Sequence, residues 1–167
     1  MKKLVTVMLI AFTTVNFSLT AQTASSVLSP VYESYFLLKD ALVKGDDNAA
    51  QKAAGTLYNN IVAVPMDKLG SSHPTWMNLQ PKLSFDSEHI KGTNDIDHQR
   101  EHFISLSKNI YAMMKAVKYN KTVYWQHCPM YNQQKGGADW LSLDKEIKNP
   151  YFGSKMLNCG SITETIE

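Results

Sequence analysis

95-DIDHQREHFISLSKNIYAMMKAVK-118 carries the strongest periodic signal in this sequence, and the fold class follows from it. Asn94 or Asp95 is suited to cap a helix at its start, and the lysines of the last turn complement the helix dipole. Over six turns, apolar residues recur close to the helical period: Ile96, Phe103, Leu106, Ile110, Met113 and Val117. The stretch is therefore predicted to be a long amphipathic helix.

Two further helices are predicted before it. Residues 30–45 place apolar side chains three and four positions apart and end at a glycine, which is a common helix stop. Asp46 or Asp47 is suited to cap a second helix over residues 48–64, and Pro65 ends that helix.

A fourth helical segment, residues 76–90, is expected to break near Pro81 and to stop at Gly92. Four helical segments joined by short connections favour an antiparallel bundle. The sequence thus predicts a mainly α protein, with a four-helix-like antiparallel bundle over residues 30–118.

The composition changes after this bundle. Residues 122–131 and 138–143 are β-branched, aromatic and apolar, and the turn residues 132–137 between them contain Gly136-Gly137, which predicts a β-hairpin. Residues 161–166 alternate like a short strand. Residues 119–167 are therefore expected to form a small C-terminal cap of hairpin and loops, within a single domain over residues 30–167.

The first residues read as a targeting segment. Residues 1–21 combine two lysines with a short apolar run and a small residue at the expected cleavage point, which predicts a secretory signal peptide. Residues 22–29 are rich in Ser, Thr and Ala and are predicted to be a flexible N-terminus. The mature protein is therefore expected to be periplasmic or secreted, without a membrane span.

The charge pattern excludes some partners. The only charged residues of the predicted signal peptide are its two lysines, so its removal takes the formal net charge from +2 to zero. The remaining charges are scattered rather than clustered. This argues against a nucleic-acid partner or an anionic membrane surface, because both require clustered lysine and arginine.

Cysteine usage points to the C-terminal cap. The two cysteines, Cys128 and Cys159, have 30 residues between them. In an exported protein such a pair is a candidate disulfide, which would restrain the unfolded chain by about 3–4 kcal/mol.

Each cysteine also has a methionine close to it in sequence, Met130 after Cys128 and Met156 before Cys159. Thiolate and thioether ligands are soft and suit Cu(I) better than Zn(II), Mg(II) or Ca(II). These four sulfurs are therefore candidate copper ligands. The alternative is that both methionines are adaptable core packing.

Histidines offer possible further ligands. His127 precedes Cys128, but neighbours on a strand point to opposite faces, so His127 shares a site only if Pro129 distorts the strand. His98 and His102 are spaced i, i+4, which puts both rings on one helical face. His102 borders the apolar stripe and joins the sulfur ligands if the cap folds over this helix.

No catalytic motif is present in the sequence. It lacks a serine-centred elbow, a P-loop, a dinucleotide fingerprint, a C-x-x-C zinc pair and a C-x-x-C-H haem site. The sequence therefore predicts a binding protein and no enzyme.

The run 127-HCPMYNQQKGGADWLSLDKEIKNPYFGSKMLNCGSITETI-166 resembles a family of exported bacterial domains of unknown function, as does 97-DHQREHFISLSKNIYAMMKA-116. Members of that family also occur fused to periplasmic adaptor subunits of copper and silver efflux pumps. The resemblance implies metal handling, with a heavy-metal efflux or metal-transfer protein as partner. It points to Cys128, Met130, Met156 and Cys159 as ligands, with His102 as an addition.

Two functional hypotheses result. The first is a periplasmic domain that binds a soft metal, Cu(I), for buffering or transfer. The second is a metal-free interaction domain of the cell envelope, stapled by a Cys128–Cys159 disulfide.

Overall fold

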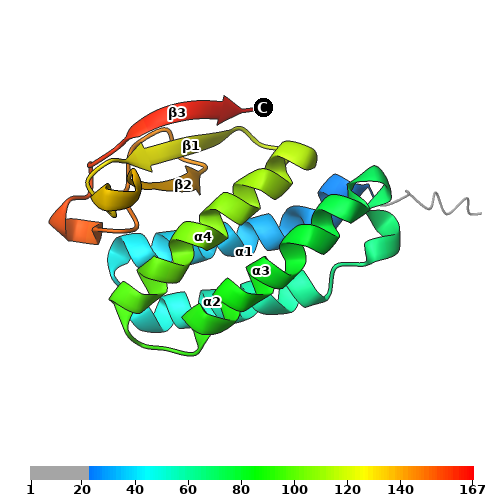
Figure 1. Cartoon of the computed structure of the whole chain (residues 1–167), viewed down its shortest axis with the longest axis horizontal. Coiled ribbons are helices and arrows are strands. Elements are labelled where there is room, and N and C mark those ends of the chain that lie inside the picture. The colour runs from blue at the N-terminus through cyan, green and yellow to red at the C-terminus, as the bar shows by residue number, and fades with distance from the viewer. Residues whose placement is uncertain (1–22) are drawn as a thin grey trace, which may run out of the picture.

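A computed structural model describes residues 23–167, and helices form most of it (Figure 1). The helices are α1 (Ala24–Lys44), α2 (Asp47–Val62), α3 (His73–Lys91) and α4 (Ile96–Ala116), and the strands are β1 (Val123–Cys128), β2 (Ala138–Ser142) and β3 (Ser161–Ile166). Short 3-10 turns lie at Met66–Lys68, Gly70–Ser72, Gln133–Lys135 and Gly153–Lys155. The mainly α fold class with a small C-terminal β element is confirmed. The predicted signal peptide, residues 1–21, lies outside the described residues.

The helix ends follow the predicted capping chemistry. Gly45 ends α1 in the left-handed conformation, at φ 71°, which a residue without Cβ adopts without strain. Asp46 then caps α2 by accepting a hydrogen bond from the Ala49 N–H at 2.8 Å. At the start of α4 the Asp95 side chain accepts from the Asp97 N–H at 3.0 Å. These caps confirm the predicted starts of the second and fourth helices.

Helix α1 begins earlier than expected, so the prediction of a flexible segment over residues 22–29 is wrong for residues 24–29. Thr23 caps the helix by accepting a hydrogen bond from the Ser26 N–H at 3.3 Å. Val27 and Leu28 are buried in the first turns. The serines and alanines suggested a mobile terminus, but apolar burial on one face extends the helix through them.

Helix α3 is continuous, so the expected break near Pro81 is also wrong. Pro81 lacks the N–H that would bond the Met77 carbonyl, yet the helix runs through it from His73 to Lys91. Leu79 and Leu83 on either side of Pro81 are buried. Their packing against the bundle outweighs the missing hydrogen bond.

The four helices run alternately up and down, and each packs against the next (Figure 1). Between α1 and α4, the Tyr35 ring stacks on the Phe103 ring with 5.2 Å between the centroids. The largest fully buried side chains include Trp76, Trp140, Tyr32, Tyr35, Tyr151 and Phe103. None of the helices formed by residues 23–167 combines the length and apolar character that crossing a bilayer requires.

The cap is a three-stranded antiparallel sheet in the order β2-β1-β3. The hairpin of β1 and β2 was expected, and the structure adds β3 on the other edge of β1. Strand β2 packs on α4 and α1 (Figure 1). There, the buried Tyr35 hydroxyl accepts a hydrogen bond from the Leu141 N–H at 3.0 Å and lies 2.8 Å from the Ser107 hydroxyl.

Arg100 joins the loop after β2 to the bundle. Its side chain is only 7% exposed. The guanidinium Nε donates to the Pro150 carbonyl at 3.0 Å, and Nη2 donates to the Leu42 carbonyl at 3.3 Å. A buried cation thus fixes the segment that leads to Cys159.

Candidate metal centre

The two cysteines meet in the cap. Cys128 is the last residue of β1, and Cys159 lies two residues before β3. Because His127 pairs with Ser161 in the antiparallel register, the two segments lie side by side. The Sγ atoms are 2.8 Å apart, both cysteines are free thiols, and Cys128 is fully buried while Cys159 is partly exposed. The site therefore has one sheltered sulfur and one that solvent reaches.

Asn149 positions the segment that carries Cys159. Its buried side-chain amide donates to the Cys159 carbonyl at 2.7 Å. The same side chain accepts from the Tyr151 N–H at 2.8 Å and the Phe152 N–H at 3.2 Å. The Asn-Pro-Tyr-Phe-Gly motif is therefore a structural support for the cysteine site.

Gly160 lets this segment approach β1 closely. Its φ is 146°, a conformation that L side chains rarely adopt. A Cβ at this position would lie 2.8 Å from the His127 carbonyl oxygen and 2.9 Å from Cη2 of Trp140. The glycine after Cys159 is thus required for the two cysteine segments to meet.

The thiol of Cys159 is held in the protonated form. Burial raises the pKa of Cys159 to about 11, and the neighbouring Cys128 acts in the same direction. The Met130 N–H opposes this by hydrogen bonding to the Cys159 sulfur. Since metals bind the thiolate, a metal that enters this site must displace protons.

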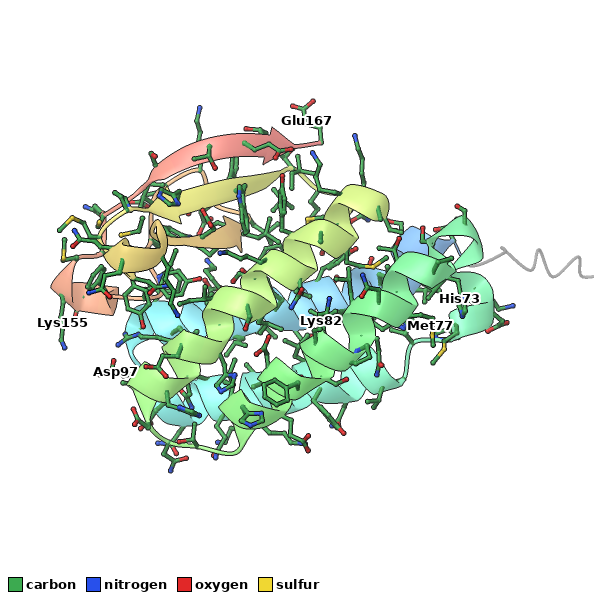
Figure 2. The ribbon with its side chains drawn as sticks, viewed as in Figure 1. His73, Met77, Lys82, Asp97, Lys155 and Glu167 are labelled. Carbon is green, nitrogen blue, oxygen red and sulfur yellow. The ribbon has the colours of Figure 1, made fainter. Side chains whose placement is uncertain are left out.

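The two methionines, which lie close to the cysteines in sequence, are on the surface. Met130 is 48% exposed and Met156 is 38% exposed, so the alternative that both are core packing is wrong. The chain leaves β1 at Cys128, and Gln133 Nε2 donates to the Met130 thioether at 3.4 Å. On the other side, the Cys159 N–H donates to the Met156 carbonyl at 3.1 Å. Figure 2 shows Lys155, the neighbour of Met156, at the outer edge of the cap.

His127 points away from the thiols, as strand alternation predicts. Its Nδ1 lies 2.7 Å from Asp139 Oδ1 on the adjacent strand β2. An imidazole that hydrogen-bonds to Asp139 is not placed to bind the same ion as Cys128.

His102 lies at the interface of α3 and α4 and not in the cap. Its Nδ1 is 3.0 Å from Oδ1 of the buried Asp86, and its ring lies 4.6 Å from the ring of His89. The structure therefore does not bring His102 to the cysteine pair, because its face of α4 packs on α3 while the cap packs elsewhere on the helix.

Comparison with known families supports the helical part of this description. The family described as a protein of unknown function, DUF3347, matches residues 31–122. The chain belongs to the DUF3347 family. No curated protein and no solved structure gives a significant match to it.

The DUF3347 match covers the bundle and stops before β1. All four candidate sulfur ligands of this DUF3347 protein lie beyond the matched residues. Family membership is thus established by the helices, while the chemistry proposed for the cap depends on the cap itself.

Within residues 23–167, no three or more histidine, cysteine, aspartate or glutamate side chains are arranged as a ready-made metal site. A centre built on the two thiols would need ligands of another type, and the thioethers of Met130 and Met156 are the candidates nearest to the cysteines in sequence. Thioethers as well as thiolates suit Cu(I), because it is a soft ion.

Sequence reasoning did not identify His89 and Asp86 as partners of His102. Both residues lie on α3, and only the packing of α3 against α4 brings them to His102. Helical spacing relates residues within one helix, so no local signal indicated this contact.

Proposed function

We propose that this DUF3347 protein binds a soft metal ion, Cu(I), through Cys128 and Cys159, with Met130 and Met156 as thioether ligands. The main observation in its favour is that two free thiols from distant segments of the chain lie close together, with their sulfurs 2.8 Å apart. A thiolate pair is the ligand type that Cu(I) prefers. On this proposal the protein is a binding protein rather than an enzyme.

The exposure of the ligands supports buffering or transfer of the ion. Cys159 is partly exposed, and the two thioethers are among the exposed large hydrophobic side chains of the described residues. A second protein can therefore reach the metal from outside the cap. We propose that the protein acts in the periplasm or outside the cell, and that its partner is a heavy-metal efflux or metal-transfer protein, in line with the family resemblance.

Competition with a chromophoric Cu(I) chelator under anaerobic conditions tests the proposal. Wild-type protein is expected to withdraw one equivalent of Cu(I) from the chelator and to release protons, because both thiols must ionise. Cys128→Ser and Cys159→Ser are each expected to abolish this withdrawal. Undiminished Cu(I) affinity in both variants would overturn the proposal.

Conservative variants separate ligand loss from unfolding. Met130→Leu and Met156→Leu keep side-chain size and polarity similar and are expected to weaken Cu(I) binding. Met77→Leu is the matched control, because Met77 is 50% exposed and lies on α3, away from the cap. Its affinity is expected to equal that of the wild type.

The same proximity of the thiols supports the second candidate, a disulfide-stapled interaction domain without metal. Alkylation of freshly isolated protein, unfolded in denaturant without reductant so that burial protects neither thiol, distinguishes the two. If neither cysteine is labelled, the pair is a disulfide and the copper proposal fails for the isolated form. If both are labelled, the disulfide candidate fails.

A further inference from the structure

Three of the five histidines gather at the interface of α3 and α4. The His102 ring lies 4.6 Å from the His89 ring and 4.8 Å from the His98 ring, between centroids. His89 comes from α3, whereas His98 and His102 come from α4. We call these three residues the histidine cluster. The proposed sulfur site does not use any of them.

Hydrogen bonds orient two of these rings in the same way. His89 Nδ1 lies 2.9 Å from the Phe85 carbonyl oxygen, which can only accept, so Nδ1 carries the proton. His102 Nδ1 lies 3.0 Å from Oδ1 of the buried Asp86, a second acceptor. With Nδ1 engaged in this way, Nε2 is the nitrogen of each ring that is left to bind a ligand.

This arrangement is the usual support of a metal-bound histidine. Ligating imidazoles generally donate their other N–H to a carboxylate or a backbone carbonyl, which fixes the tautomer and strengthens the ligand. His102 with Asp86 and His89 with Phe85 reproduce the two common versions of that support.

The surroundings favour a cation. His89 and His98 line an open surface hollow of about 340 Å³, together with Glu88, Gly92 and Thr93. The Glu101 carboxylate lies 3.8 Å from His98 Nδ1. Figure 2 shows Asp97, the residue before His98, at the start of α4, where the chain has just left α3. Asp97 is paired with Arg100 and Glu88 with Lys91, so Glu101 is the carboxylate that lies against a cluster ring.

We propose that the histidine cluster is a second metal site, specific for a borderline divalent ion such as Zn(II) or Cu(II). Imidazole ligands suit these ions, whereas Mg(II) and Ca(II) prefer oxygen ligands. The cluster is not a ready-made site, since the rings of His89 and His102 stack at an interplanar angle of 26°. The two stacked rings part by small movements that keep their hydrogen bonds to Phe85 and Asp86, and the more exposed His98 rotates to converge on the ion.

A Zn²⁺ titration of the wild-type protein, followed by the ¹⁵N-edited ring signals of its five histidines, tests the proposal. Before addition of the ion, His89 and His102 are expected to show the tautomer protonated at Nδ1. On addition of Zn²⁺, the Nε2 signals of these two rings are expected to shift with a stoichiometry of one ion. His73 and His127 lie outside the cluster and are expected to stay unchanged.

The readout keeps this site separate from the sulfur site. Zinc bound only at the thiols would move the signal of His127, which neighbours Cys128, and leave the three cluster rings unchanged. That result would overturn the second site without touching the copper proposal. Equal shifts of all five rings would also overturn it, because they would show nonspecific binding.

Variants provide a second measurement. His89→Ala and His102→Ala are each expected to weaken Zn²⁺ binding at the cluster by at least about tenfold, and His73→Ala is the matched control. Asp86→Leu tests the positioning role of Asp86 because it removes the acceptor: His102 should lose its preference for the Nδ1-protonated tautomer, and affinity should fall about 10–100-fold. Full affinity in His89→Ala and His102→Ala would overturn the proposal.

Discussion

Cys159 shows how a single residue combines conflicting requirements. It is partly exposed, so a partner can reach it, yet burial and the nearby Cys128 raise the pKa of its thiol to about 11. A raised pKa keeps the sulfur protonated and slows its reactions with oxidants and alkylating agents, because the thiolate is the reactive form. The Cys159 thiol is therefore unreactive until it loses its proton.

The rate of alkylation tests the raised pKa of Cys159. The pKa of Cys159 is raised from 9.0 to about 11, so reduced, metal-free protein at pH 8 contains about a hundredfold less Cys159 thiolate than an unperturbed cysteine would give. Iodoacetamide is expected to label Cys159 more slowly by about that factor. The rate should rise with pH until about pH 11.

Denatured protein serves as the control, since unfolding removes both causes of the shift. A native rate equal to the denatured rate at pH 8 would contradict the described environment of Cys159.

At the same scale, sequence analysis named the candidate ligand residues but predicted only part of how they are arranged. The strand alternation that separated His127 from Cys128 is local, and the structure agrees with it. The partner of His102 was not predictable in this way, because Asp86 lies 16 residues away on another helix. Local periodicity predicts which face of its own helix or strand a side chain occupies. The neighbour that this face contacts is determined by tertiary packing.

At the scale of elements, α3 carries a defect that its packing tolerates. Pro81 lies inside the helix and is exposed, and the Met77 carbonyl loses its helical donor there. Pro81→Ala is expected to raise the free energy of unfolding by about 1–3 kcal/mol, because it restores that hydrogen bond and removes a poor helix former. Urea denaturation measures the change.

Pro74 is the matched control for this substitution. It lies in the first turn of α3, where a missing N–H costs nothing because that group has no helical acceptor. Pro74→Ala is expected to give no gain in stability. If Pro81→Ala also gave none, the restriction that proline places on the unfolded chain would have to outweigh the helical defect.

Most elements were predictable because their signals are local. The period of α4, the caps Asp46 and Asp95, and the glycines of the hairpin each specify structure within a few residues. The start of α1 was missed, because the burial of Val27 depends on contacts made by the folded bundle. The pairing of β3 with β1 is also long-range, so alternation predicted the strand but not its neighbour.

At the scale of the whole molecule, the cap and the bundle share one set of buried interactions. The Tyr35 hydroxyl of α1 meets Ser107 of α4 and the backbone of Leu141 in β2. Arg100 adds one hydrogen bond from α4 to the Pro150 carbonyl. These contacts lead us to expect that cap and bundle unfold together, so the proposed copper site exists only in the fully folded protein.

Tyr35→Phe tests this coupling. The substitution removes one hydroxyl and leaves the buried Leu141 N–H and Ser107 hydroxyl without that partner, which is expected to lower the free energy of unfolding by about 1–3 kcal/mol. Amide hydrogen exchange measures the opening free energy of each element separately. We expect the slowest amides of β1 and β2 and those of α4 to lose protection by the same amount.

Tyr58→Phe is the control for this measurement. The Tyr58 ring packs against the Lys91 ammonium at 3.7 Å on the outside of the bundle, and its hydroxyl makes no hydrogen bond to another residue of the described chain. It is expected to leave exchange unchanged. If Tyr35→Phe lowered protection in the sheet alone, the cap would open independently of the bundle. The cysteine pair would then be exposed by local opening, and metal exchange would not require the helices to unfold.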